Sequence, residues 1–97
     1  MKTLQDLKVW PDDYLNQVIN ADSLEVMKLM PDKFVDLVLT DPPYGTTSNE
    51  WDKVVDFWSE FRRISRGGAI VFSSQPYTSE LICANKKEYK CSWIWNK

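Results

Sequence analysis

An apolar, β-branched run that ends in two consecutive prolines constrains the fold of this chain more than any other feature. The run extends from Phe34 to Thr40, and Asp41-Pro42-Pro43-Tyr44 follows it directly. A nearly continuous apolar run of this length is typical of a strand that is buried on both faces. Proline then ends the strand, because it has no backbone N–H to donate to a sheet. We therefore expect a buried strand over 34–40 and a rigid turn over 41–44.

Strand and helix signals alternate along the rest of the chain. Residues 1–15 show no sustained period and are interpreted as a loop or arm. A helix is expected from an N-cap at Ser23 to the position before Pro31. The other expected strands are 18–20, 69–72 and 89–95, and the other expected helices are 52–64 and 78–85. This order predicts an α/β fold with a mostly parallel sheet and crossover helices.

Length and composition exclude several classes of protein. A chain of 97 residues can build one small core but not two domains. No apolar run approaches the ~20 residues of a membrane helix, and the first residues do not resemble a signal peptide, so we expect no membrane partner and a cytoplasmic location. The chain has no histidine, and Cys83 and Cys91 form no C-x-x-C pair. We therefore expect no metal site and two buried free thiols.

The charges are distributed unevenly around a net charge of -2. Residues 1–60 carry 5 Lys/Arg and 12 Asp/Glu, whereas residues 61–97 carry 7 and 2. The basic side chains of the second part either line an edge that faces a polyanion or form a solvated surface, and the latter is the commoner case. The candidates for such an edge are six of the seven, namely Arg62, Arg63, Arg66, Lys86, Lys87 and Lys90.

The residues after the buried run are suited to binding the exocyclic amine of a nucleobase. Ligands bind beyond the carboxyl ends of strands in a doubly wound sheet, which is where Asp41 falls. The Asp41 carboxylate and the Pro42 carbonyl can accept both N–H groups of such an amine, and Pro43 fixes the turn. Tyr44 offers a ring for stacking, and a base in a duplex would have to be flipped out to reach it. The alternative is a rigid turn with a buried tyrosine.

At these residues the chain resembles the amino-methyltransferases that use S-adenosylmethionine to methylate adenine N6 or cytosine N4 in DNA. Asp41 to Tyr44 matches the catalytic tetrapeptide of that family. Asp22 matches the acidic residue that reaches the adenine of the cofactor, although a helix cap is an equally good interpretation. The resemblance covers most of the chain, namely Ile19 to Ser23, Phe34 to Gly45, Trp51-Asp52, Gly67 to Phe72, Gln75-Pro76-Tyr77 and Trp93 to Lys97.

The resemblance implies a partial, truncated Rossmann-like methyltransferase fold, in which residues 1–97 form the amino-terminal, catalytic-motif part of a single domain. It implies S-adenosyl-L-methionine as the cofactor and double-stranded DNA with a flipped base as the partner. The implied site residues are Asp41, Pro42, Pro43 and Tyr44 for catalysis, Asp22 and Asp41 for the cofactor, and Tyr44 and Gly45 for the substrate.

Two parts of the family pattern are absent from the sequence. The family has a glycine-rich F-x-G-x-G segment for the cofactor and a region that recognises the DNA target, but the only glycines here are Gly45, Gly67 and Gly68. In the subgroup whose catalytic motif comes first, both parts would lie beyond Lys97. We therefore expect a truncated or split reading frame or an excised piece, with a second chain as the candidate source of these parts.

Several alternatives remain open at this level. Aspartate at position 41 favours adenine, because the cytosine-N4 enzymes more often carry serine there. The chain can instead be a non-catalytic remnant or binding fragment, and a related enzyme acting on RNA bases or protein glutamine is less favoured because residues 1–40 contain no glycine. Trp51, Gln75 and Tyr77 either border the flipped base or cofactor, or belong to the core.

Overall fold

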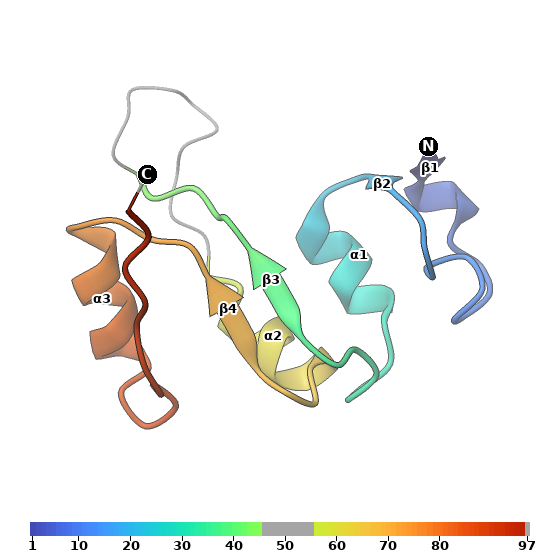
Figure 1. Ribbon diagram of the computed structural model, residues 1–97. Helices are drawn as coiled ribbons and strands as arrows, with labels where there is room; N and C mark the ends of the chain where they lie inside the picture. The colour runs from blue at the N-terminus through green and yellow to red at the C-terminus, as the bar shows by residue number, and fades with distance from the viewer. Residues whose placement is uncertain (46–55, 97) are drawn as a thin grey trace. The chain divides into compact units, whose positions relative to one another are not determined.

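Short strands and helices alternate along residues 1–45 and 56–96, which are the residues that the computed structural model describes (Figure 1). The α/β order expected from the sequence is confirmed. The elements are β1 (Lys2–Thr3), a short 3-10 helix η1 (Leu4–Asp6), β2 (Ile19–Asn20), α1 (Ser23–Leu29), β3 (Val38–Thr40), α2 (Trp58–Ile64), β4 (Ala69–Val71) and α3 (Tyr77–Ala84).

The described strands form two parallel pairs. β1 pairs with β2, with Lys2 opposite Ile19 and Thr3 opposite Asn20. β3 pairs with β4, and both strands run in the same direction (Figure 1). Since α2 lies between β3 and β4 in the chain, these three elements form a βαβ unit of the kind that crossover helices produce. A single continuous sheet was expected, but the described strands form two separate sheets of two strands each. The Rossmann-like arrangement stays a prediction.

The chain divides into two compact units. The first comprises Met1–Thr40 and Asp56–Ile70, and the second comprises Asp41–Val55 and Val71–Lys97. In the first unit Met27 of α1 is buried against Phe61 and Ile64 of α2. Burying a side chain of this size stabilises a fold by about 1.5–3 kcal/mol, so this cluster holds the two helices together. The partly buried residues packed around it are Leu24, Met30, Val35, Val38, Phe57, Trp58 and Ala69.

Backbone hydrogen bonds join residues 33–38 to residues 63–68 in the first unit. The N–H of Val35 donates to the carbonyl of Ile64 at 3.0 Å, and the N–H of Gly67 donates to that of Asp36 at 2.9 Å. A Cβ atom at Gly67 would lie 2.4 Å from the Asp36 carbonyl oxygen. Glycine at 67 is therefore required by this close approach, and not only to end the preceding helix.

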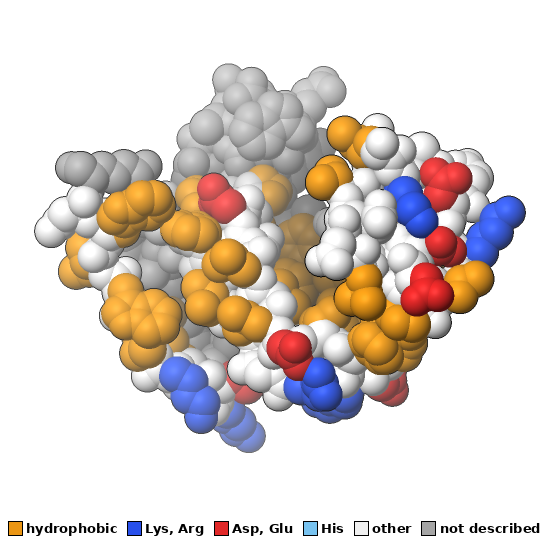
Figure 2. Space-filling view, turned by 45° about the vertical axis from the view of Figure 1, so that its right-hand side comes forward, with side chains coloured by type: hydrophobic (Ala, Val, Ile, Leu, Met, Phe, Trp, Pro, Cys, Tyr) orange, Lys and Arg blue, Asp and Glu red, His pale blue; other side chains and the backbone are white. Residues whose placement is uncertain are grey.

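The expectation of a strand buried on both faces over 34–40 is wrong in this chain. The regular strand is limited to Val38–Thr40, with a parallel bridge at Val35. Val35 and Val38 face the cluster of Met27, Phe61 and Ile64, but Leu37 is 49% and Leu39 65% exposed. Within the regular strand alternate side chains point to opposite faces, so Val38 contacts the cluster while the face that carries Leu39 is left exposed. Other hydrophobic side chains also lie at the surface (Figure 2).

The amino-terminal segment is more ordered than the predicted loop or arm. Besides β1 and η1, it contains a turn built around Asp13, whose carboxylate accepts the N–H groups of Lys8 and Val9 at 2.9 and 2.7 Å. These hydrogen bonds, with that of the Lys2 ammonium, lower the pKa of Asp13 to about 2. Side-chain to backbone bonds of this kind leave no periodic pattern, which explains why the sequence did not reveal them.

Three further expectations from the sequence are wrong. The segment 89–96 contains no strand, and Trp93 and Ile94 are 77% and 90% exposed, because an alternating pattern forms a strand only where a partner is present. Both cysteines are free, as expected, but they are exposed rather than buried. Finally, α1 is capped by Asp22 and not by Ser23, since the Asp22 carboxylate accepts the Leu24 N–H at 2.9 Å.

The bounds of α1 and α3 are close to those predicted, and α2 ends where it was predicted to end. α1 ends at Leu29, before Pro31, and α3 begins one residue earlier than expected. α2 begins at Trp58, where the Asp56 carboxylate accepts the Trp58 N–H at 3.0 Å, so the prediction of a helix over 52–64 is wrong for Asp56 and Phe57. The predicted start at Asp52 lies outside the described residues. None of the helices found here has the length and apolar character that crossing a membrane requires.

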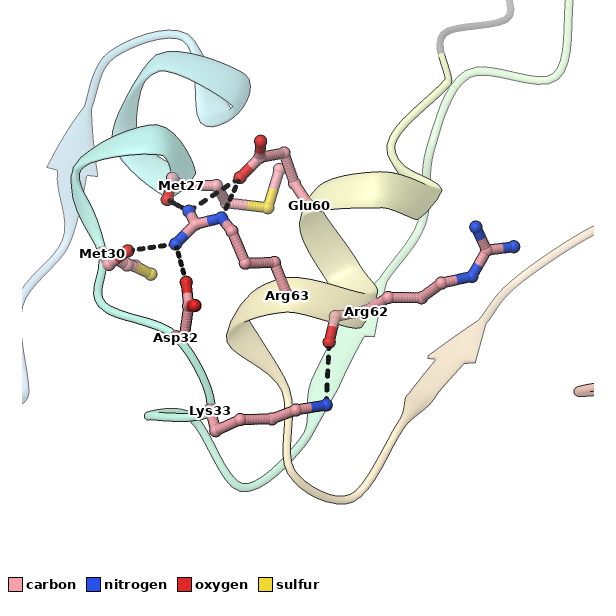
Figure 3. Close-up of polar contacts among 7 residues, drawn as sticks. All are labelled: Met27, Met30, Asp32, Lys33, Glu60, Arg62 and Arg63. Atoms are coloured by element: carbon pink, nitrogen blue, oxygen red, sulfur yellow. Dashed lines mark hydrogen bonds and ion pairs between the residues drawn. The ribbon is translucent and has the colours of Figure 1, made fainter.

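Arg63 of α2 forms hydrogen bonds with the carboxyl-terminal end of α1 (Figure 3). Its guanidinium donates to the carbonyls of Met27 and Met30, which belong to the last turn of α1 and its C-cap. It also pairs with Asp32 at 3.0 Å and with Glu60 at 2.8 Å. The hydrogen bond to Glu60, which has the larger effect, and that to Asp32 raise the pKa of Arg63. The carbonyls at a helix end have no partner within the helix and carry partial negative charge. Arg63 therefore has a structural role in the first unit.

We expect Arg63→Met to lower the free energy of unfolding by about 2 kcal/mol, because hydrogen bonds to charged groups contribute about 1.5–3 kcal/mol. Arg66→Met is the matched control, since Arg66 forms a solvent-exposed pair with Asp36 and such pairs contribute about 0–1 kcal/mol. Urea denaturation followed by circular dichroism measures both. Equal losses in the two variants would contradict the role given to Arg63.

Candidate functional site

The segment Asp41 to Gly45 follows β3 and belongs to the second unit. Asp41 is exposed, Pro42 is buried, and Pro43 and Tyr44 are half-buried. The two prolines restrict the backbone here. Gly45 has a φ of 74°, a left-handed conformation that glycine adopts without strain. The segment is neither helix nor strand, as expected, and it leaves the Asp41 carboxylate accessible to solvent.

Among residues 1–45 and 56–96, two contacts hold the side chain of Tyr44. Its hydroxyl donates a hydrogen bond of 2.5 Å to Oδ1 of Asp41. Its ring stacks on that of Tyr77, with the ring centroids 5.2 Å apart and the planes 24° from parallel. The Tyr44 side chain is therefore held at its tip by a carboxylate and on one face of its ring by a second aromatic ring.

The same surroundings keep Tyr44 neutral. Burial, followed by the hydrogen bond and the negative charge of Asp41, raises the pKa of Tyr44 to about 12. Burial also raises the pKa of Tyr77. At neutral pH the Tyr44 hydroxyl is thus a hydrogen-bond donor to Asp41, and its ring is an uncharged surface for stacking.

Asp41 keeps acceptor capacity beyond its bond with Tyr44. An ionised carboxylate offers about four lone-pair positions on two oxygens, and the Tyr44 hydroxyl uses one of them. The neighbouring Pro42 contributes a carbonyl acceptor and no N–H. The segment can therefore accept hydrogens from a small planar amine beside a ring on which a flat heterocycle can stack.

Asp22 lies in the first unit, at the start of α1. One of its carboxylate oxygens accepts the N–H of Leu24 at 2.9 Å, so the helix-cap interpretation describes its role in the fold. Asp22 is exposed, and its second oxygen gives the side chain further acceptor capacity. A role in binding the cofactor stays a prediction.

Of the three residues that the sequence left ambiguous, Tyr77 has the clearest link to the site. It is the first residue of α3, only 6% exposed, and it contacts Tyr44. Gln75 supports the start of α3, because its side-chain oxygen accepts the N–H and hydroxyl of Ser79 at 3.2 and 2.8 Å. Trp51 lies outside the described residues. Tyr77 belongs to a segment that carries the family resemblance, but a contact across 33 positions of the chain cannot be derived from sequence pattern alone.

The part of the chain that the structure describes holds no group of three or more His, Cys, Asp or Glu side chains that could bind a metal ion.

Comparison with known proteins finds similarity to methyltransferases. The chain is 32% identical to the Type II methyltransferase M.HinfI of Haemophilus influenzae over 59 residues, which cover 52% of this chain and 16% of the relative. It is 36% identical to the Type II methyltransferase M.BglII of Bacillus subtilis over 44 residues, which cover 45% of this chain and 12% of the relative. No family model matches the chain, and no solved structure matches it.

These similarities support the methyltransferase resemblance for a fragment. The aligned part spans about a sixth or less of the length of either relative. The functions of individual residues, the cofactor and the target atom therefore stay proposals.

We expect Asp41→Ala to lower the pKa of Tyr44 from about 12 toward its ordinary value of 10.0, because the variant loses both the hydrogen bond and the negative charge. Between pH 10 and about pH 12 the Tyr44 hydroxyl loses its proton in the unfolded chain but keeps it in the folded chain. Folding stability should therefore fall across this window, and it should fall over a narrower window in the variant.

Carbon NMR of the tyrosine rings as a function of pH measures this value, with Tyr44→Phe used to assign the signal. Asp36→Ala, which removes an exposed carboxylate of the first unit, is the control and should leave the pKa of Tyr44 unchanged. A Tyr44 signal that titrates at about 10 in the wild type, as an unperturbed tyrosine does, would contradict the described geometry.

Proposed function

We propose that this chain carries the catalytic segment of a site-specific DNA methyltransferase that transfers a methyl group from S-adenosylmethionine to the N6 amine of adenine. The observation that carries the proposal is the exposed Asp41 carboxylate beside the Tyr44 ring, in a segment that directly follows a parallel strand. The similarity to two Type II methyltransferases supports the same reaction class. The remaining parts of the domain come from another polypeptide or from a longer form of this one.

The chemistry that the segment supports is activation of a weak nucleophile. The lone pair of an exocyclic amine is delocalised into the base, so the nitrogen is planar and unreactive. Acceptance of its two hydrogens by the Asp41 carboxylate and the Pro42 carbonyl favours a pyramidal nitrogen with its lone pair free. In this proposal the two acceptors stabilise a charge that develops only during the reaction, and such stabilisation lowers the barrier.

The cofactor, when bound, supplies an electrophilic methyl group on a positively charged sulfur. Once the nitrogen carries that methyl group its proton is acidic, and we assign the acceptance of this proton to the Asp41 carboxylate. The reaction therefore does not need a strong base. This agrees with the surroundings of Asp41, which is exposed and has an uncharged tyrosine as its neighbour.

Acceptor groups of the chain fit the hydrogen-bonding needs of the cofactor. S-adenosylmethionine carries an amine on its adenine and an ammonium on its methionine part, and both are donors. Asp22 is exposed and uses one oxygen for the Leu24 N–H, so its other oxygen can accept from the adenine amine. Asp41 is the second carboxylate that we assign to the cofactor.

A target base in double-stranded DNA must be flipped out to reach Asp41. Tyr44 would then stack on the flipped base, an interaction that contributes about 1–3 kcal/mol. Gly45 has no side chain and allows the base to approach the backbone after Tyr44. A DNA substrate also fits the cytoplasmic location expected from the sequence.

The second candidate function is a non-catalytic binding fragment. The glycine content of the sequence favours this function. Gly45, Gly67 and Gly68 are the only glycines, and none of them belongs to an F-x-G-x-G segment. A fragment of this kind retains the stacking tyrosine but cannot hold the methionine part of the cofactor by itself. Methylation of cytosine N4 is the corresponding alternative for the target atom.

The test combines this chain with the part of M.HinfI that lies outside the aligned stretch, with S-adenosylmethionine and DNA. We expect methylated DNA with the wild-type chain and at least a 100-fold lower methylation rate with Asp41→Ala. A loss of this size is expected when one group that stabilises the transition state is removed. Asp36→Ala is the matched control and should keep the rate within about twofold, because surface substitutions usually change little. Mass spectrometry of the released nucleosides identifies the product.

Asp22→Ser adds a test of the cofactor site in the same assay. Serine keeps an oxygen that caps α1, but its side chain is shorter and uncharged. This variant should need more S-adenosylmethionine for half its maximal rate at an unchanged circular dichroism spectrum. Methylation that persists in Asp41→Ala would contradict the mechanism, and N4-methylcytosine as the product would contradict the adenine target. DNA binding by this chain alone, with no methylation in the combined assay, would favour the binding fragment.

A further inference from the structure

The ring of Tyr44 has two faces, and Tyr77 covers one of them. The two rings are nearly parallel, with planes 24° apart and centroids separated by 5.2 Å. Offset stacking at this separation is among the favourable arrangements of an aromatic pair. A base that stacks on Tyr44 can therefore approach only from the face that Tyr77 leaves open.

Tyr77 is well placed to hold another ring in position. It begins α3 and is 6% exposed, so its side chain has little freedom to move. The chain around it is fixed by the Thr78 N–H, which donates to the Ser74 carbonyl at 3.0 Å. The Gln75 side chain, bonded to Ser79, adds a second attachment at the same helix start.

Contact with Tyr77 also affects the Asp41 carboxylate, which is the hydrogen-bond acceptor of the site. The Tyr44 hydroxyl is bonded to Asp41, so the ring and the carboxylate are linked. A Tyr44 ring that turned away from Tyr77 would carry its hydroxyl away from Asp41. The position of the stacking surface and the orientation of the carboxylate therefore depend on the same contact.

We propose that Tyr77 is a positioning residue, which holds Tyr44 so that a flipped base forms the third ring of a base–Tyr44–Tyr77 stack beside Asp41. The inference rests on the proposed function for the identity of the base. The contact itself and its effect on Tyr44 do not depend on that function. Without Tyr77 the Tyr44 side chain samples several rotamers, and each base that binds must first order it.

The experiment compares Tyr77→Leu, which removes the stacked ring, with Tyr77→Phe, which keeps it. Tyr89→Leu is the matched control, because Tyr89 is an exposed tyrosine of the same unit whose hydroxyl is bonded to Ser92. Carbon and proton NMR of the full chain reports the Tyr44 ring signals. Quenching of a single-stranded oligonucleotide that carries one fluorescent aminopurine base reports stacking of a base.

We expect the Tyr44 signals to move toward those of an exposed tyrosine in Tyr77→Leu, and to stay in place in Tyr77→Phe and Tyr89→Leu. The affinity for the aminopurine oligonucleotide should fall about 3- to 10-fold in Tyr77→Leu, the range that one aromatic pair contributes, and should be restored in Tyr77→Phe.

Unchanged Tyr44 signals in Tyr77→Leu would overturn the positioning role, as would a loss in Tyr77→Phe equal to that in Tyr77→Leu. If Tyr77→Leu does not fold, Tyr77→Phe tests the positioning role instead. Tyr44 signals and affinity that are retained in Tyr77→Phe show that the Tyr77 ring, and not its hydroxyl, is the essential group. A Tyr44 ring that moves in Tyr77→Leu, in a chain whose wild type does not quench aminopurine, would support the positioning role and contradict the base-binding function.

Discussion

Parallel backbone pairing between residues 33–38 and 63–68 is the constraint on which the rest of the first unit depends. It fixes the register of the strand that leads to Asp41, and it joins this strand to the end of α2. Gly67 permits the close approach, since any Cβ there would meet the Asp36 carbonyl. Burial of Met27, Phe61 and Ile64 stabilises one side of this pairing, and Arg63 bonds the last carbonyls of α1.

The candidate site depends on a small number of contacts in the second unit. Pro42 and Pro43 restrict the backbone, so that Asp41 and Tyr44 lie within hydrogen-bond distance of each other. Tyr77 adds a second support for the Tyr44 ring. An accessible carboxylate, a carbonyl without a competing N–H and a fixed ring are the groups that capture of a planar amine requires. This combination, together with the similarity to Type II methyltransferases, underlies the proposed reaction.

Local signals predicted the order of elements from β2 to α3 and most helix bounds, because caps, prolines and apolar periodicity act within a few residues. The α1 start near Asp22 and its end before Pro31 are examples. Burial was predicted less well, because it depends on partners that a local pattern does not contain. Leu39 and Trp93 illustrate this. The sequence pattern predicts that each lies in a strand, packed in the core, but each side chain is largely exposed. The same limit applies to the site, where the Asp41 segment was recognisable but the Tyr77 contact required the structure.

Photo-crosslinking is the most direct test of the claim that a nucleobase stacks on Tyr44. The chain would be irradiated with DNA oligonucleotides in which iodouracil replaces single bases, and the modified residue identified by mass spectrometry of its peptides. The account predicts that the principal crosslink lies at Tyr44 and is lost in Tyr44→Leu. Crosslinks confined to the exposed Trp93 and Trp95, with Tyr44 unmodified, would contradict it.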